Sequence, residues 1–133
     1  MLRGQHVLIV EDEPLIDLEQ ALSAAGAKVG ISSTVDSALE AAEAPAVTAA
    51  IIDLRLHGQS VRNVVELLAT RDLPFIFYSG NAETPTAASW PSVPFLVKPL
   101  LATQVVDMLA RVVATKRGRT RPAEKGDTPS QED

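Results

Sequence analysis

The sequence lacks cysteine, has few aromatic residues and contains no long apolar run. Without cysteine the chain can form neither a disulfide bond nor a zinc site with thiolate ligands. No run is long enough to span a membrane, and the short apolar stretch near the N-terminus ends at Glu11, unlike a signal peptide. The net charge of −5 argues against a general nucleic-acid binder, which would carry a basic patch. We therefore expect a soluble, cytoplasmic protein without membrane or nucleic-acid partners.

The length and composition fit one packed domain. The chain has 133 residues, of which 46% are hydrophobic. Apolar periodicity continues to about residue 115, after which basic and acidic residues mix with glycine and proline. We predict a domain at 1–115 and a disordered, charged tail at 116–133. A basic contact site for a partner is the alternative for the tail, although charged runs are usually solvated.

Short apolar runs alternate with helical patterns along the domain. The strand candidates are His6–Val10, Lys28–Ile31, the run that ends at Asp53, Phe75–Tyr78 and Phe95–Val97. This alternation predicts an α/β fold in which helices cover both faces of a parallel sheet. Because crossovers are right-handed, the most economical arrangement is a doubly wound, five-stranded, flavodoxin-like sheet with the order 2-1-3-4-5.

The helix between the fourth and fifth strands has little sequence available to it. Thr84 suits an N-cap and Pro85 suits a first helical turn. Pro91 then blocks continuation, and the residue before it is biased away from helical geometry. We therefore predict that this fourth helix is short or absent.

Polar residues stand at the ends of four of the predicted strands. Glu11 and Asp12 follow the first strand, Asp53 ends the third, Ser79 the fourth and Lys98 the fifth. The carboxyl ends of parallel strands open onto one edge of a sheet, where ligands bind. Clustered carboxylates repel one another, and oxygen ligands favour Mg²⁺, with Mn²⁺ as a substitute. The central Asp53 is the natural nucleophile for phosphoryl transfer, with Ser79 and Lys98 holding phosphoryl oxygens.

Four stretches of the sequence resemble one known family. They are Val7–Pro14, Ile51–Leu54, Phe77–Gly80 and Phe95–Pro99. Over roughly residues 5–115 the chain resembles the receiver domains of response regulators in two-component signalling, of the stand-alone, single-domain type. The resemblance implies a phosphoprotein that accepts a phosphoryl group from a sensor histidine kinase or a phosphotransfer protein. It also implies that the chain catalyses only its own phosphotransfer and dephosphorylation.

The resemblance assigns a phosphoacceptor and a set of metal ligands. It implies that Asp53 carries the phosphoryl group as an aspartyl phosphate. It implies that Glu11, Asp12 and Asp53 bind Mg²⁺. A further ligand is the backbone carbonyl of Arg55, two residues after the phosphoacceptor.

The resemblance also assigns phosphate-binding and switch residues. Ser79 and Lys98 would bind the phosphoryl group, and Ser79 with Phe95 would form the conformational switch. The peptide bond between Lys98 and Pro99 is usually cis in this family. Output would follow by contact with an unknown downstream protein, or the chain would act as a phosphate sink, as a monomer or weak dimer.

Some features depart from the family pattern or allow other interpretations. His57 stands where proline is frequent. The run from Glu11 to Glu13 also suits the start of a helix, and Phe95 also suits a plain core position. A pseudo-receiver, which keeps the fold without accepting phosphate, is the alternative function. A flavin-binding enzyme would need a phosphate loop after the first strand, where these acids would repel phosphate.

Overall fold

The computed structural model describes residues 1–80 and 84–119, in which strands and helices alternate. The strands are β1 (His6–Val10), β2 (Lys28–Ser32), β3 (Ala49–Ile52), β4 (Arg55–Leu56), β5 (Gln59–Ser60), β6 (Phe75–Ser79) and β7 (Phe95–Val97). The helices are α1 (Ile16–Ala24), α2 (Val35–Glu43), α3 (Arg62–Thr70), α4 (Pro85–Ser89) and α5 (Ala102–Arg119).

Five strands form one parallel sheet in the order β2-β1-β3-β6-β7. β3 lies in the middle and all four of its residues are buried, as expected for a strand that is covered on both faces. The small strands β4 and β5 pair with each other in a separate hairpin. The sheet therefore confirms the predicted doubly wound order 2-1-3-4-5.

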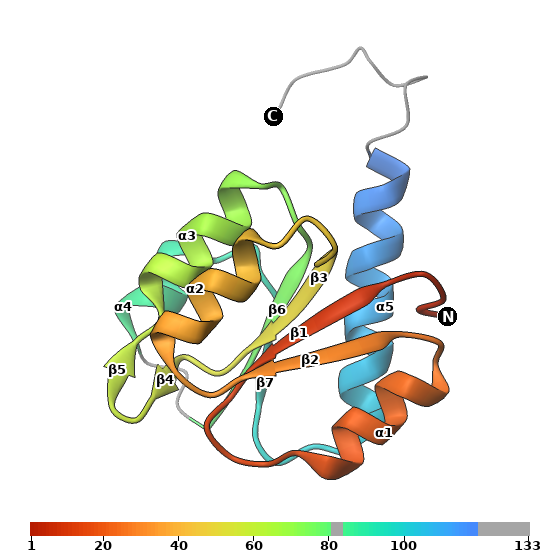
Figure 1. The fold of residues 1–133 in the computed structure, drawn as a ribbon, viewed down its shortest axis with the longest axis horizontal. Helices are drawn as coiled ribbons and strands as arrows, with labels where there is room; N and C mark the ends of the chain where they lie inside the picture. The colour runs from red at the N-terminus through yellow and green to blue at the C-terminus, as the bar shows by residue number, and fades with distance from the viewer. Residues whose placement is uncertain (81–83, 120–133) are drawn as a thin grey trace.

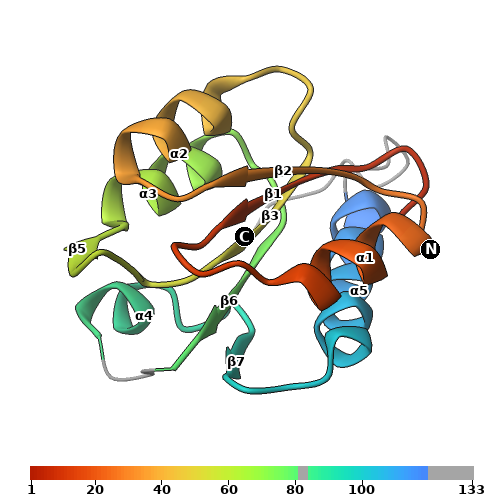
Figure 2. The same cartoon turned by 60° about the horizontal axis from the view of Figure 1, so that its bottom comes forward.

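Helices cover both faces of this sheet. Figures 1 and 2 show α2 and α3 on one face and α1 and α5 on the other. Alternating side chains of β3 supply both cores: Ala50 and Ile52 pack with α2 and α3, whereas Ala49 and Ile51 pack with α1 and α5. Because both faces are covered, polar groups on the central strands can reach water only at the strand ends.

Helix α4 is short, as predicted. It spans only Pro85–Ser89, with proline in its first turn. The Thr84 hydroxyl caps it by accepting a hydrogen bond from the Ala87 N–H at 3.1 Å. The helix ends at Ser89, and at the next residue, Trp90, the backbone leaves helical geometry. A helix of this length is marginal by itself and depends on its neighbours for stability.

A hairpin replaces part of the predicted loop after β3. Arg55 pairs with Ser60 and Leu56 with Gln59, in antiparallel register. The two turn residues, His57 and Gly58, both have positive φ angles, of 49° and 78°. Two such residues in a two-residue connection are typical of a type I′ turn, whose twist matches the flanking strands. The hairpin was not predicted from the sequence because its turn, His57-Gly58, lacks the asparagine or aspartate before glycine that usually signals a two-residue hairpin.

Helix α5 extends further than predicted. It continues to Arg119, so the prediction that the disordered tail begins at 116 is wrong for 116–119. Burial of Val113 and an ion pair between Lys116 and Asp72 hold this last part of the helix against the domain. The rest of the predicted tail, 120–133, lies outside the described residues. Neither α5 nor any other helix within 1–80 and 84–119 has an apolar stretch long enough to cross a membrane.

Candidate functional site

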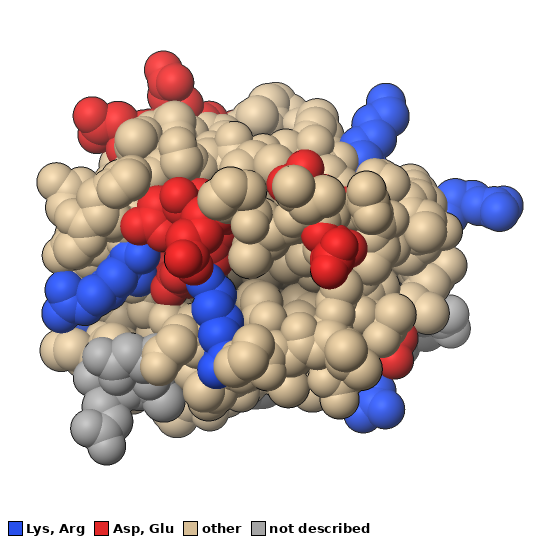
Figure 3. All heavy atoms as spheres, turned by 90° about the horizontal axis from the view of Figure 1, so that it is seen from below, with Lys and Arg blue, Asp and Glu red and all other residues tan. Residues whose placement is uncertain are grey.

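Three carboxylates meet at the carboxyl edge of the sheet. Val10 is in register with Ile52, so Glu11 and Asp53 follow neighbouring strands at the same level. The Asp53 N–H donates to the Val10 carbonyl at 2.9 Å and continues the pairing by one step. One carboxylate oxygen from each of Glu11, Asp12 and Asp53 lies within 4.8 Å of the others. Figure 3 looks onto this edge and shows acidic side chains gathered in one cluster, with basic side chains against it.

Lys98 reaches this cluster from the end of β7. Its Nζ donates to Glu11 Oε1 at 2.5 Å and to Asp53 Oδ2 at 3.0 Å. A third carboxylate, that of Glu13, lies 3.6 Å from the same ammonium group but is mostly exposed. The peptide bond from Lys98 to Pro99 is cis, as the resemblance implied. One lysine therefore faces more negative charge than it can neutralise.

Ser79 completes the bonding of the central aspartate. The Ser79 hydroxyl, at the buried end of β6, donates to Asp53 Oδ1 at 2.6 Å. The Arg55 N–H approaches the same oxygen at 3.4 Å. The two oxygens of Asp53 thus have separate partners, a hydroxyl on one and an ammonium group on the other. A carboxylate held in this way has a fixed orientation at the mouth of the site.

The pKa shifts follow from burial and charge. Burial raises the pKa of Glu11 to about 7, the negative charge of Asp53 adds to this, and Lys98 opposes it. Burial alone would lower the pKa of Lys98, but its bonds to Glu11 and Asp53 outweigh burial and raise it. A hydrogen bond from the His57 N–H lowers the pKa of Asp12. The excess negative charge makes the cluster a favourable place for a cation.

The donor set fits a hard divalent cation. All three side chains offer carboxylate oxygens, which Mg²⁺ and Mn²⁺ prefer. Ligands on opposite sides of Mg²⁺ lie about 4 Å apart, so oxygens within 4.8 Å of one another need only a small inward movement. Glu11 is buried beneath the cluster, while Asp12 is partly open to solvent and leaves room for water ligands.

The structure brings together most of the side chains that the sequence singled out. Phe95 lies apart from them on β7, half-buried, with its ring centroid 6.0 Å from that of Phe77. Two contributors were not predicted from the sequence. The His57 N–H donates to Asp12 at 2.8 Å. The centroid of the Tyr78 ring lies 5.7 Å from Lys98 Nζ, and the Tyr78 hydroxyl accepts a hydrogen bond from the Leu100 N–H at 3.0 Å. Both hydrogen bonds use a backbone N–H, which side-chain patterns do not reveal.

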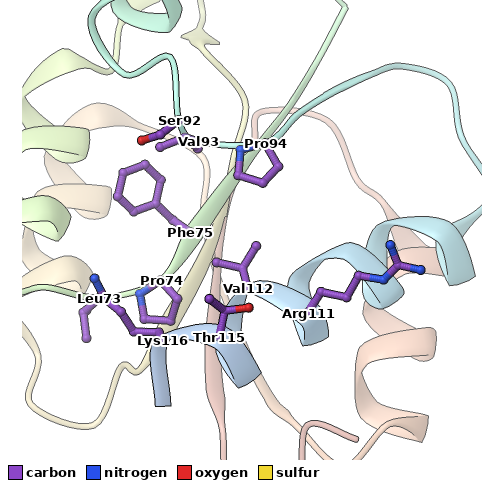
Figure 4. Close-up of a pocket in the computed structure, with 10 residues that line it drawn as sticks. All are labelled: Leu73, Pro74, Phe75, Ser92, Val93, Pro94, Arg111, Val112, Thr115 and Lys116. Atoms are coloured by element: carbon purple, nitrogen blue, oxygen red, sulfur yellow. The ribbon is translucent and has the colours of Figure 1, made fainter. Parts of the chain in front are cut away.

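A cavity of about 330 Å³ lies at the opposite edge of the sheet (Figure 4). Residues that precede β6 and β7 line it, together with the later turns of α5; examples are Leu73, Pro94 and Val112. Because ligands of open α/β sheets bind at the carboxyl ends of the strands, this apolar cavity is separate from the candidate site. The candidate functional site is therefore the cluster of Glu11, Asp12 and Asp53 at the carboxyl edge.

Several solved structures are similar to this chain. No family model matches the chain. No curated protein matches it either. SdrG from Sphingomonas melonis Fr1 is 35% identical, with a TM-score of 0.70 over 85% of this chain and 96% of SdrG. A CheY-like receiver domain from Methanospirillum hungatei JF-1 is 18% identical, with a TM-score of 0.77 over 86% of this chain and 98% of that one.

A third likeness is to the receiver domain of a sensor histidine kinase from Pseudomonas aeruginosa PAO1. It is 23% identical, has a TM-score of 0.69 and covers 84% of this chain and 98% of that one; its structure holds a magnesium ion in the active-site cleft. At such low identities the two receiver domains show a common fold. The 35% identity to SdrG over most of both chains adds a relationship in sequence. The chain therefore belongs to the family of response-regulator receiver domains.

Proposed function

We propose that this chain is a phosphorylation-controlled signalling protein whose phosphoacceptor is Asp53. The donor is a sensor histidine kinase or a phosphotransfer protein. The proposal rests on one observation: the two oxygens of Asp53 are held by Ser79 and Lys98 beside two further carboxylates. Formation of an aspartyl phosphate needs a nucleophilic carboxylate, here Asp53, and hydrogen-bond donors beside it, here Ser79 and Lys98. The chain catalyses only its own phosphotransfer and dephosphorylation.

Phosphoryl transfer to Asp53 needs positioning and charge stabilisation more than proton chemistry. A carboxylate oxygen of Asp53 forms a bond to phosphorus while the bond from phosphorus to the donor histidine nitrogen breaks. The electron pair of that bond leaves with the imidazole. Lys98 and Ser79, which already contact the acceptor carboxylate, are in reach of the phosphoryl oxygens that arrive there.

Glu11, Asp12 and Asp53 are the side chains that would hold Mg²⁺, and Mn²⁺ is the expected substitute. When bound, the cation neutralises charge on the phosphoryl group. The backbone carbonyl of Arg55 is the further ligand that we propose. In antiparallel pairs, residues alternate between those that exchange hydrogen bonds and those that do not. The Arg55 N–H approaches Asp53 rather than Ser60, which indicates a pair of the second kind and leaves the carbonyl available.

The output of the switch would pass through Ser79 and Phe95. A phosphoryl group on Asp53 attracts the Ser79 hydroxyl, and Phe95 can turn toward the space beside it. The short α4 next to them offers little resistance to such a change. Phosphorylation thus shifts the population between two states of the surface around β7. A downstream protein that prefers one state receives the signal, or the chain serves as a phosphate sink, as a monomer or weak dimer.

The test is phosphorylation by a small donor. With acetyl phosphate and Mg²⁺, we expect the mass of the protein to increase by one phosphoryl group on the peptide that contains Asp53. Asp53→Asn should abolish this gain, because the amide is a poor nucleophile, and chelation of Mg²⁺ should suppress it. Asp36→Asn, which removes an exposed aspartate on α2, is the matched control and should label normally. Labelling of the same peptide in the Asp53→Asn variant would refute the assignment, and no labelling of the wild type would favour a pseudo-receiver.

A further inference from the structure

The hairpin of β4 and β5 contacts the acidic cluster directly. The backbone N–H of His57 at its tip donates to Asp12 Oδ2 at 2.8 Å, across 45 positions of the sequence. The imidazole contributes less, because its Nδ1 lies 3.9 Å from the same oxygen and 63% of its side chain is exposed. The contact that fixes Asp12 is therefore made by the backbone of the hairpin.

This N–H is held in place before any ligand arrives. The turn residues His57 and Gly58 have the positive φ angles of a type I′ turn, whose twist matches that of the paired strands β4 and β5. The Arg55 guanidinium donates to the Gly58 carbonyl at 3.0 Å and closes the turn from the outside. Leu56, only 1% exposed, anchors the hairpin in the core. A donor fixed by these contacts can orient the carboxylate to which it binds.

We propose that His57 is a positioning residue for the cation site and that it acts through its backbone N–H. With Oδ2 of Asp12 engaged by the hairpin, Oδ1 remains for the cation. This inference rests on the proposed function, which makes Asp12 a metal ligand. Groups that hydrogen-bond to metal ligands fix their orientation, and their loss typically weakens metal affinity 10- to 100-fold. The lowered pKa of Asp12 agrees with this arrangement, because the N–H favours the ionised carboxylate.

The same hairpin carries the Arg55 carbonyl that we propose as a further ligand. One small element would then set the position of two groups around the cation. Proline, which is frequent at position 57 in the family that the sequence resembles, has no N–H and cannot make this bond. This chain can therefore form the hydrogen bond because it has histidine and not proline at position 57, and replacing His57 by proline removes the bond.

Two variants separate the backbone from the imidazole. His57→Pro removes the N–H and also changes the turn, because proline holds φ near −65° and cannot adopt the positive φ of His57. His57→Gly removes the imidazole, keeps the N–H and accepts a positive φ without strain. Mg²⁺ alone is titrated into the full chain, and its Kd is measured by calorimetry or from amide chemical shifts near Asp12. We expect His57→Pro to weaken Mg²⁺ binding about tenfold and His57→Gly to retain most of the affinity.

A second measurement does not depend on the folding of the proline variant. In metal-free wild type the His57 amide proton should exchange slowly, and Asp12→Ala should make it exchange quickly. Equal losses of Mg²⁺ affinity in the Pro and Gly variants would assign the effect to the imidazole and overturn the inference. Wild-type affinity in His57→Pro would overturn it while leaving the proposed function intact. Failure of the wild type to bind Mg²⁺ at all would overturn both.

Discussion

Glu11 is a buried acid whose charge opposes folding when no cation is bound. Its side chain is only 2% exposed, and burial raises its pKa from the ordinary 4.5 to about 7. A difference of that size corresponds to roughly 3 kcal/mol of folding free energy when Glu11 is ionised. The pKa of about 7 already includes the opposing hydrogen bond and charge of Lys98, so this free energy is the net effect of burial, Asp53 and Lys98. Glu11→Gln removes the charge while keeping an oxygen that can accept the Lys98 hydrogen bond.

The sign of the effect depends on pH. Because the pKa of Glu11 is higher in the folded protein, its protonation stabilises folding, fully below pH 4.5. That contribution is lost as the pH rises to about 7. The Gln variant, which is always neutral, should therefore match the wild type at low pH and exceed it increasingly up to neutral pH. With a few °C per kcal/mol for a domain of this size, the difference in Tm should approach about 10 °C at most.

Thermal unfolding in a chelating buffer, followed by circular dichroism across this pH range, measures the difference. Glu13→Gln is the matched control, since Glu13 also lies near Lys98 but its side chain is 71% exposed. It should change Tm little at any pH. A difference between wild type and Glu11→Gln that stays constant with pH, or that reverses sign, would refute this account of Glu11. Saturating Mg²⁺ should reduce the difference in Tm between the wild type and Glu11→Gln at neutral pH, because Mg²⁺ binds the ionised wild type.

Three further outcomes follow from the same site. Asp53→Asn should raise the Tm of the metal-free protein, because it removes a negative charge beside Glu11. Mg²⁺ should raise the Tm of the wild type. Unchanged melting curves in both experiments would contradict a metal site. Lys98→Met should lower the metal-free stability by about 3 kcal/mol in denaturant unfolding at neutral pH, since it leaves two carboxylates without their cation. Backbone amides of 84–93 should exchange with deuterium faster than those of 105–113 in the unmodified protein, and their exchange should slow when beryllofluoride and Mg²⁺ are added. Strong protection of 84–93 that these additions do not change would place the switch elsewhere.

The sheet and most of its site could be predicted because both depend on short-range patterns. A strand such as β3, buried along its whole length, must be apolar until it ends, so Asp53 stands out at its end. The same logic locates Ser79 and Lys98, and the parallel order then brings the strand ends to one edge. The short α4 was predictable because Pro85 marks its first turn and Pro91 prevents it from continuing.

The remaining features depend on contacts that the side-chain pattern does not carry. The positive φ of His57 is unfavourable by itself and is stabilised by the surrounding hairpin. The N–H of His57 is a donor that every residue except proline has, so the residue type does not reveal its contact with Asp12. The last turn of α5 has no apolar periodicity of its own, yet it continues because Val113 is buried and Lys116 pairs with Asp72. Tertiary contacts of this kind override local sequence signals.

Lys98 occupies, in the structure, the electrostatic role that a divalent cation is expected to take. Its ammonium group bonds to Glu11 and Asp53, which are both proposed metal ligands. A cation that binds these carboxylates must compete with Lys98 for them, so cation binding weakens the hydrogen bonds from Lys98 to Glu11 and Asp53. The released ammonium group is then available to a phosphoryl oxygen on Asp53. Because such coupling is reciprocal, a phosphoryl group that engages Lys98 strengthens cation binding by the same factor. The Mg²⁺ dependence that we propose for phosphorylation would then follow from one lysine that is shared between two acids.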